Sequence, residues 1–253
     1  MAVYWPPLTM KISNIHPRVR DFALARLSPE GAFGLHLTIG VALLMAAAYV
    51  FGGIAEEVVT HDDITGVDVV LSNWFHTHKH GPFTPFMLFV THMHNTIGML
   101  VMSLLAAGYL RWKRDHYWLL TLILAVPGGM LLNVLLKYLF QRARPTFEDP
   151  LLTLATYSFP SGHTMAATVF YGVMAAYIVC TVRRWKAGMA AVAMACAMVA
   201  LVALSRVYLG AHYLSDVLAA MVEGCGWLAI CITASATLRR RRAGSPGKTS
   251  KGK

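Results

Sequence analysis

Residues 117–136 read YWLLTLILAVPGGMLLNVLL and contain no charged side chain. A helix of about 20 apolar residues is long enough to cross the hydrocarbon core of a bilayer, which is about 30 Å thick. The stretch therefore predicts a membrane-spanning helix. Its composition also suggests the class of the whole chain, because similar stretches recur on both sides of it.

Five further apolar segments of comparable length predict an all-α fold, a bundle of six transmembrane helices. The six spans are expected at Leu37–Ile54, Phe83–Leu110, Tyr117–Leu136, His163–Val182, Ala187–Leu204 and Val217–Leu238. The composition agrees, because 57% of the residues are hydrophobic and 13% are charged, whereas about a quarter of the residues in a soluble domain are charged. A cleaved signal peptide is not expected, since mixed polar residues precede the first span without a convincing cleavage site.

The net charge of +10 is concentrated in short basic clusters between the apolar segments. These clusters are Arg18, Arg20 and Arg26; Arg111, Lys113 and Arg114; Arg183, Arg184 and Lys186; and Arg239–Arg242. They fall at every second connection, and basic connections mark the cytoplasmic side of a membrane protein. We therefore expect a location in the inner (plasma) membrane, with both termini in the cytoplasm and the acidic stretch Glu56–Asp68 outside. Topology explains these charges, so nucleic-acid binding is not expected.

The sequence predicts one membrane domain with two polar extensions. Residues 1–35 are expected to form a cytoplasmic arm and residues 36–238 the six-helix domain. Residues 239–253 are basic and rich in Gly, Ser and Lys, and we expect a disordered tail that lies on anionic headgroups. The four cysteines lie in or beside apolar segments and match neither a disulfide framework nor a zinc pattern.

Ionisable residues gather in the two outward connections that follow the third and fifth spans. Lys137 and Arg144 are seven residues apart and would share one face of a continuous helix, which Pro145 then stops. Residues 161–163, Ser-Gly-His, open the fourth span, where unpaired backbone N–H groups and the helix dipole favour an anion. The second connection, Ser205–Asp216, places a histidine and an aspartate four residues apart, as on one helical face.

Three motifs in this order resemble the type 2 phosphatidic acid phosphatase (PAP2) family of integral membrane lipid phosphatases. They are Lys137 with Arg144-Pro145, then Pro160–His163, then Ser205–Asp216. The resemblance implies an active site at the extracytoplasmic membrane interface. It also implies metal-independent hydrolysis of a lipid phosphate or diphosphate through a phosphohistidine, with no cofactor. Similar bacterial proteins act on undecaprenyl diphosphate, phosphatidylglycerol phosphate or phosphatidic acid.

The resemblance assigns a role to each residue of the motifs. His212 would be the nucleophile and Asp216 would fix its tautomer, while His163 would serve as general acid and then activate water. The substrate phosphate would be bound by Lys137, Arg144, Ser161, Gly162 and Arg206. Phosphoryl transfer concentrates negative charge on the equatorial oxygens, and three cationic side chains supply the positive charge that metal ions supply in many phosphatases.

Three other functions share part of this sequence pattern. The motifs describe only the site that receives the donor phosphate, so a membrane phosphotransferase with a lipid or sugar acceptor is an alternative. A channel or scaffold that kept the fold would be expected to lose a catalytic position, and none is lost. Vanadium-dependent haloperoxidases share the motifs, but six spans argue against the soluble members. The expected partners are therefore the lipid phosphate and the surrounding membrane lipids.

Histidines alternate along the stretch before the second span, at His76, His78 and His80. In a strand-like segment they would share one face, and closely spaced histidines can bind zinc or copper. However, no carboxylate or cysteine is close by in sequence, and Lys79 would repel a cation. We expect these histidines to line the substrate's path at the membrane interface.

Two further charged residues lie near the motifs. Glu223 falls two turns below Asp216 inside the sixth span. A carboxylate there is costly to bury and therefore suggests a functional role. A protonated acid that is hydrogen-bonded within the bundle is the favoured interpretation. Arg142 lies between Lys137 and Arg144 and is expected to point to a different face, toward a second phosphate or a headgroup.

Overall fold

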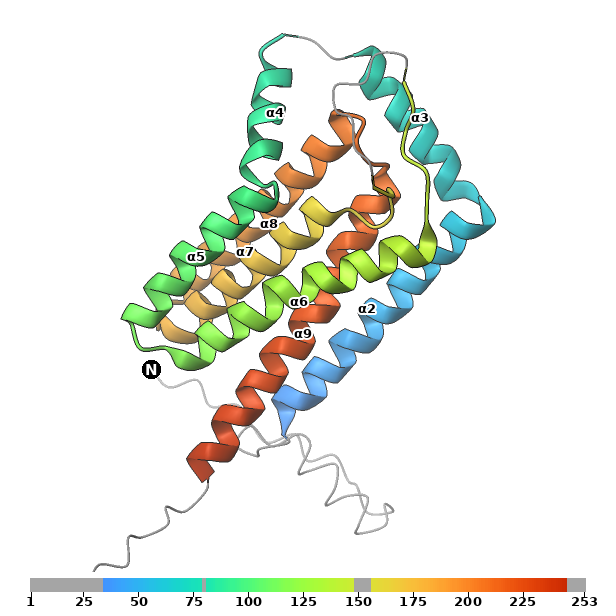
Figure 1. The fold of residues 1–253 in the computed structure, drawn as a ribbon. Coiled ribbons are helices and arrows are strands. Elements are labelled where there is room, and N and C mark those ends of the chain that lie inside the picture. Colours follow the sequence, from blue (N-terminus) through green and yellow to red (C-terminus); the bar gives the residue numbers. More distant parts are fainter. Residues whose placement is uncertain (1–33, 79–80, 148–155, 245–253) are drawn as a thin grey trace, which may run out of the picture.

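The computed structural model describes residues 34–78, 81–147 and 156–244. Within these ranges the chain forms eight α-helices and no strand (Figure 1). They are α2 (Leu35–Thr60), α3 (Asp63–Thr77), α4 (Phe83–Met93), α5 (Thr96–Trp112), α6 (His116–Phe140), α7 (Gly162–Thr181), α8 (Trp185–Tyr208) and α9 (Leu214–Gly244). The predicted all-α fold is confirmed. The N-terminal arm and residues 245–253 of the tail lie outside the described residues, apart from the last residues of the arm.

Helix α9 packs against α2, α6 and α7, and α7 packs in turn against α8. Small residues allow these close contacts, because a side chain at Gly172 would collide with Leu228 of α9. A Cβ atom at Gly128 of α6 would lie 2.6 Å from Cζ2 of Trp227. The bundle is therefore built around α9, and α3 and α4 lie across the end away from the C-terminus of α9 (Figure 1).

The outer surface of the bundle is apolar, as a lipid-facing surface must be. Large hydrophobic side chains are exposed on every side of it, among them Tyr49, Leu105, Leu139 and Trp185. Helices α2, α6, α7, α8 and α9 are each long and apolar enough to cross a membrane, and a sixth span arises if α4 and α5 are taken together. The predicted six-span architecture is confirmed in this form.

The second expected span differs from a single helix, because α4 and α5 meet at an angle of 57°. Helix α4 ends at Met93, and Asn95 caps the start of α5, since its side-chain oxygen accepts a hydrogen bond from the Gly98 N–H at 2.8 Å. Glycine is needed at position 98, where a Cβ atom would collide with the carbonyl oxygen of Met93. The break brings residues 94–96 to a cavity inside the bundle.

Two helix boundaries were also predicted incorrectly. Most of the acidic stretch expected as a connection is helical, because α2 continues to Thr60 and α3 begins at Asp63 and buries Asp68 and Ser72. The last helix does not end at Leu238 but continues to Gly244, so the basic tail begins inside a helix. Basic residues in the final turn interact favourably with the helix dipole, which explains the extension.

Candidate active site

Three segments far apart in sequence meet at the end of the bundle near α3 and α4. They are the end of α6 with the chain that follows it, the start of α7, and the turn between α8 and α9 (Figure 1). The Ser161 N–H donates to the carbonyl oxygen of Asp216 at 3.0 Å and joins two of them. Between the segments is a cavity of about 500 Å³. Six of the predicted site residues line this cavity: Lys137, Arg144, Gly162, His163, Arg206 and His212.

His212 lies in the turn between α8 and α9, with Asp216 in the first turn of α9. The expectation that they share a helical face is wrong, because Gly210 adopts a left-handed conformation (φ 69°) and the chain turns there. They nevertheless meet, with His212 Nδ1 3.3 Å from Asp216 Oδ2. The same carboxylate oxygen accepts hydrogen bonds from the Tyr213 N–H at 2.9 Å and from the Ser158 hydroxyl.

The imidazole of His212 is buried and uncharged. Its side chain is only 2% exposed. Burial lowers the pKa of His212 to about 3, although the carboxylate of Asp216 acts in the opposite direction. The ring is therefore neutral at ordinary pH. With Nδ1 directed at Asp216, the second ring nitrogen, Nε2, lies 3.1 Å from Arg144 Nη1.

Lys137 and Arg144 reach the cavity by different routes. Helix α6 ends at Phe140 and Gln141 turns the chain in a left-handed conformation, so Arg144 follows in an extended segment. The expected continuous helix through both residues is therefore wrong. Lys137 Nζ donates to the carbonyl oxygen of Tyr157 at 2.8 Å, and Arg144 Nη1 donates to that of Ala211 at 2.6 Å.

Arg206 is the most deeply buried cation of the site, with 1% of its surface exposed. Its Nη1 donates to the Thr91 hydroxyl, but Nε and Nη2 have no partner within the described part of the chain. Buried guanidinium N–H groups without acceptors are costly unless a ligand satisfies them. Two parallel N–H donors match the oxygens of a phosphate group.

The first turn of α7 supplies the remaining predicted residues. Ser161 is buried, and its oxygen accepts a hydrogen bond from the Thr164 hydroxyl at 3.1 Å, so its own O–H is available to donate. Gly162 and His163 follow as the first two residues of the helix and line the cavity. The first backbone N–H groups of a helix lack partners within the helix, which makes this end suitable for an anion.

Arg142 does not point toward a second phosphate or a headgroup, as expected from the sequence. Its Nη1 lies 2.6 Å from Asp216 Oδ1 and its Nη2 lies 2.8 Å from Asp68 Oδ2. Burial lowers the pKa of Arg142, but the two carboxylates more than offset this and raise the pKa above its usual value. Sequence reasoning missed Asp68 and Ser158, because only the folded chain brings them to Arg142 and Asp216.

Glu223 is hydrogen-bonded inside the bundle, as the favoured interpretation expects. Its Oε2 accepts a hydrogen bond from Asn133 Nδ2 at 2.9 Å, and the pair is buried between α6 and α9. Asn133 also lines the cavity, one helical turn before Lys137. The carboxyl group is thus linked to the site through one side chain and does not line the cavity itself.

The histidines before the second span are not arranged along a strand. His76 lies in α3 and stacks on Phe147, with the ring centroids 4.1 Å apart. His78 ends that helix and stacks on Trp74 at 4.8 Å. His80 lies outside the described residues. Among the residues that the structure describes, no group of three or more histidine, cysteine or acidic side chains is placed to hold a metal ion.

Beyond its polar end the cavity becomes apolar and extends between α5 and α6. This part is lined by Met99, Leu100, Leu104, Ala107, Ile123, Val126, Pro127 and Met130. A cavity with cationic groups at one end and hydrocarbon along the rest matches an amphiphile that carries a phosphate.

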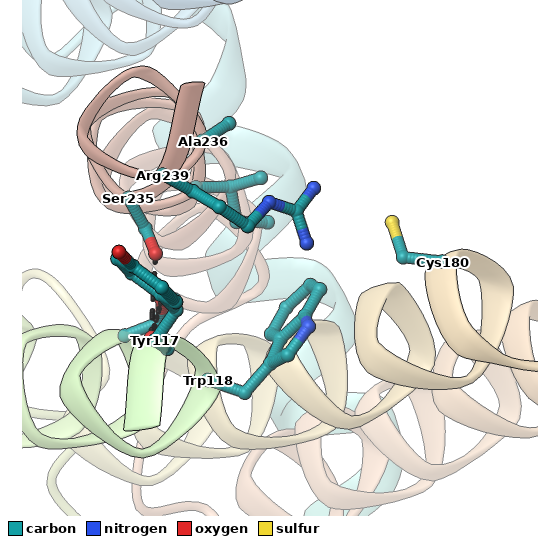
Figure 2. A pocket seen from close by; sticks show the side chains of 8 residues that line it. Tyr117, Trp118, Cys180, Ser235, Ala236 and Arg239 are labelled. Atoms are coloured by element: carbon teal, nitrogen blue, oxygen red, sulfur yellow. Dashed lines mark hydrogen bonds between the residues drawn. The ribbon is translucent and has the colours of Figure 1, made fainter. Parts of the chain in front are cut away.

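A second, much smaller cavity lies at the opposite end of the bundle (Figure 2). Its volume is about 50 Å³, and Tyr117, Trp118, Cys180 and Arg239 contribute to its wall. Such a volume holds a few water molecules at most. The larger cavity is therefore the candidate active site.

Fold and site together define an integral membrane protein in which a cluster of buried cationic and histidine side chains lies at one end of an apolar cavity. Residues 116–240 match the PAP2 superfamily, and this region includes all eight of the predicted site residues. This match confirms the resemblance that the motifs implied.

Individual proteins support this assignment. Over 130 residues the chain is 33% identical to phosphatidylglycerophosphatase B of Bacillus subtilis (strain 168), which covers 51% of this chain and 64% of that protein. The chain thus matches less than two thirds of that relative's length. The crystal structure of the first transmembrane PAP2 type phosphatidylglycerolphosphate phosphatase from Bacillus subtilis superposes with a TM-score of 0.69 at 26% identity. That superposition covers 75% of this chain and 94% of the other.

A more distant structure shares the fold alone. Aquifex aeolicus LpxE superposes with a TM-score of 0.52 at 22% identity, over 65% of this chain and 94% of the other. The bundle is therefore shared with a protein whose sequence has diverged widely from this one.

Proposed function

We propose that this protein is a membrane lipid phosphatase that hydrolyses a lipid phosphate or diphosphate through a phosphohistidine intermediate. The observation that carries the proposal is the neutral, buried His212 in a cavity that also contains three cationic side chains. The apolar extension of the same cavity supports a lipid rather than a water-soluble phosphate ester.

In the first step the phosphoryl group is bound by Lys137, Arg144 and Arg206. The Nε2 lone pair of His212 attacks phosphorus, and the bond from phosphorus to the leaving oxygen breaks. His163 donates a proton to that oxygen, which departs as the lipid alcohol or, from a diphosphate, as the lipid monophosphate. Negative charge on the transferring group is stabilised by the fixed cations throughout.

In the second step His163, now neutral, accepts a proton from water, and the resulting nucleophile attacks the phosphohistidine. The N–P bond breaks and phosphate leaves, which restores neutral His212. Asp216 accepts the Nδ1–H hydrogen bond in both steps and stabilises the positive charge that the ring carries while it is phosphorylated.

The substrate's hydrocarbon chains would occupy the apolar part of the cavity between α5 and α6 and reach it laterally from the bilayer. Undecaprenyl diphosphate, phosphatidylglycerol phosphate and phosphatidic acid all combine such chains with a terminal phosphate. The Bacillus subtilis relatives are named for phosphatidylglycerol phosphate, which makes this lipid the first to test.

The reaction is proposed to take place on the extracytoplasmic face of the inner membrane. The basic connections 113–115 and 182–184 and the end of α9 lie at the end of the bundle opposite the site. Positive charge marks the cytoplasmic side, so the site would open outward with both termini in the cytoplasm.

Purified protein in lipid nanodiscs should release inorganic phosphate from at least one of these three lipids. Activity should survive EDTA, because the cationic side chains replace metal ions, and vanadate should inhibit, because it adopts the five-coordinate geometry of the transferring group. Activity that disappears in chelator and returns with zinc or magnesium would contradict the metal-independent mechanism. Absence of phosphate release from all three lipids would contradict the proposed function.

A further inference from the structure

Helix α3 places a buried carboxylate behind the catalytic pair. Asp68 is 1% exposed. Its Oδ1 accepts a hydrogen bond from the Ser215 N–H at 2.9 Å, and its Oδ2 accepts from Arg142 Nη2 at 2.8 Å and from the Ser215 hydroxyl. Asp68 is therefore attached to the residue that immediately precedes Asp216.

Arg142 connects this carboxylate to the catalytic one. Its Nη1 donates to Asp216 Oδ1 and to the Ser215 hydroxyl oxygen, each at 2.6 Å. Its guanidinium also lies over the ring of Tyr213, 4.5 Å from the centroid. The planar group is thus fixed between two carboxylates and an aromatic face, an arrangement that arginine fits and lysine does not.

The two oxygens of Asp216 have separate tasks as a result. Oδ2 faces His212, while Oδ1 is held by Arg142. Without Arg142 the carboxylate would lose the partner of Oδ1 and could rotate away from the imidazole. A buried carboxylate left without a partner is also costly. The negative charge of Asp68 balances Arg142, so that the negative charge of Asp216 stays available to stabilise the phosphorylated imidazole.

We propose that Asp68 and Arg142 are positioning residues that hold Asp216, and through it His212, in the orientation for attack. The inference rests on the proposed function. Neither side chain lines the cavity, so neither touches the substrate. Asp68 also lies outside residues 116–240, the region that matches the PAP2 superfamily. Helix α3, which is not among the candidate membrane spans, would therefore contribute to catalysis.

The test measures kcat and KM for phosphate release by Arg142→Gln, Arg142→Lys and Asp68→Asn. In metal sites, removing the group that hydrogen-bonds a metal-binding side chain typically lowers activity about 10- to 100-fold. By analogy we expect kcat to fall about 100-fold in Arg142→Gln and about 10-fold in Asp68→Asn, with KM nearly unchanged. Arg142→Lys, which keeps the positive charge, should have a higher kcat than Arg142→Gln but a lower one than the wild type. Asp63→Asn, an exposed carboxylate on the same helix, is the matched control and should behave as the wild type.

A second measurement separates positioning from a general structural role. In an Asp216→Asn background, adding Arg142→Gln should change kcat by less than about twofold, because the two residues act as one unit. Independent, multiplied effects would overturn the proposal, as would a raised KM with unchanged kcat, which would make Arg142 a substrate contact. If Arg142→Gln does not fold, Arg142→Lys and Asp68→Asn can be combined with Asp216→Asn in the same way.

These measurements also distinguish failure of the positioning role from failure of the proposed phosphatase function. Wild-type activity with normal kcat in both Asp68→Asn and Arg142→Gln would overturn the positioning role and leave the phosphatase intact. A wild-type protein that releases no phosphate from any of the three lipids would overturn the proposed function and this inference with it.

Discussion

Arginine occurs at both ends of the bundle, but in opposite environments. At the site end, Arg206 is buried with two nitrogens that have no partner among the described residues, and Arg142 is fixed between two carboxylates. At the other end, Arg111 and Arg183 are exposed beside the short connections between helices. The exposed arginines are typical of membrane topology, whereas the buried ones need an anion to offset their desolvation. Burial and partners, rather than residue type, therefore distinguish chemistry from orientation.

The largest effect is expected at the nucleophile. His212→Ala and His163→Ala should each reduce turnover by about 10⁴-fold or more, as removal of a catalytic histidine does in other enzymes that act through a covalent intermediate. Phosphate release by purified variants that insert and fold normally measures this. Asp216→Asn should cost less than His212→Ala, because it disturbs orientation but keeps the attacking nitrogen. Near-normal activity of His212→Ala would contradict the mechanism.

A matched pair of arginine variants tests the comparison between the two ends. Arg206→Gln should lower kcat about 100- to 1,000-fold, the cost of losing one donor to a charged transition state. Arg183→Gln should leave kcat and KM close to wild type, because its side chain is exposed far from the cavity. Equal losses in the two variants would show that arginine content, and not burial at the site, determines activity.

The three motifs, each short and local, named eight candidate site residues, and the fold brings these residues together. Six of those residues line one cavity, and Ser161 and Asp216 are buried directly beside it. The local geometry was less predictable. Arg144 and His212 were expected on helices, but the left-handed conformations of Gln141 and Gly210 turn the chain before each of them.

The supporting residues could not be found from sequence spacing. Asp68 and Arg142 are separated by 74 positions, and they meet because α3 packs beside the start of α9, where Arg142 also binds Asp216. Asp68 also lies in an acidic stretch that topology explains equally well. A buried carboxylate and a solvated one look the same in sequence, so the distinction depends on the fold.

The orientation of the two ends can be tested by cysteine labelling. Thr77→Cys, at the end of α3, and Lys186→Cys, at the start of α8, replace exposed residues at opposite ends of the bundle. In a background without the four native cysteines, an impermeant thiol reagent added to intact cells should label position 77. Position 186 should react only after the membrane is opened. The reverse pattern would place the site in the cytoplasm.

The smallest effect is expected at Glu223. Glu223→Gln keeps the size of the side chain and an oxygen that can accept from Asn133, so phosphatase activity should change by less than about threefold. Glu223→Leu serves as the comparison, because it leaves the Asn133 amide without that partner. A large loss in Glu223→Gln would mean that the carboxyl group takes part in the reaction.

The most direct test of the account is to trap the intermediate. Wild-type and His163→Ala protein can be quenched within a single turnover under alkaline conditions, which preserve phosphohistidine, and the modified peptide identified by mass spectrometry. The account predicts a phosphoryl group on His212 that persists longer in His163→Ala, because general base catalysis of its hydrolysis is lost, and that is absent in His212→Ala. Phosphate attached to another residue, or turnover with no phosphorylated protein at any time, would contradict it.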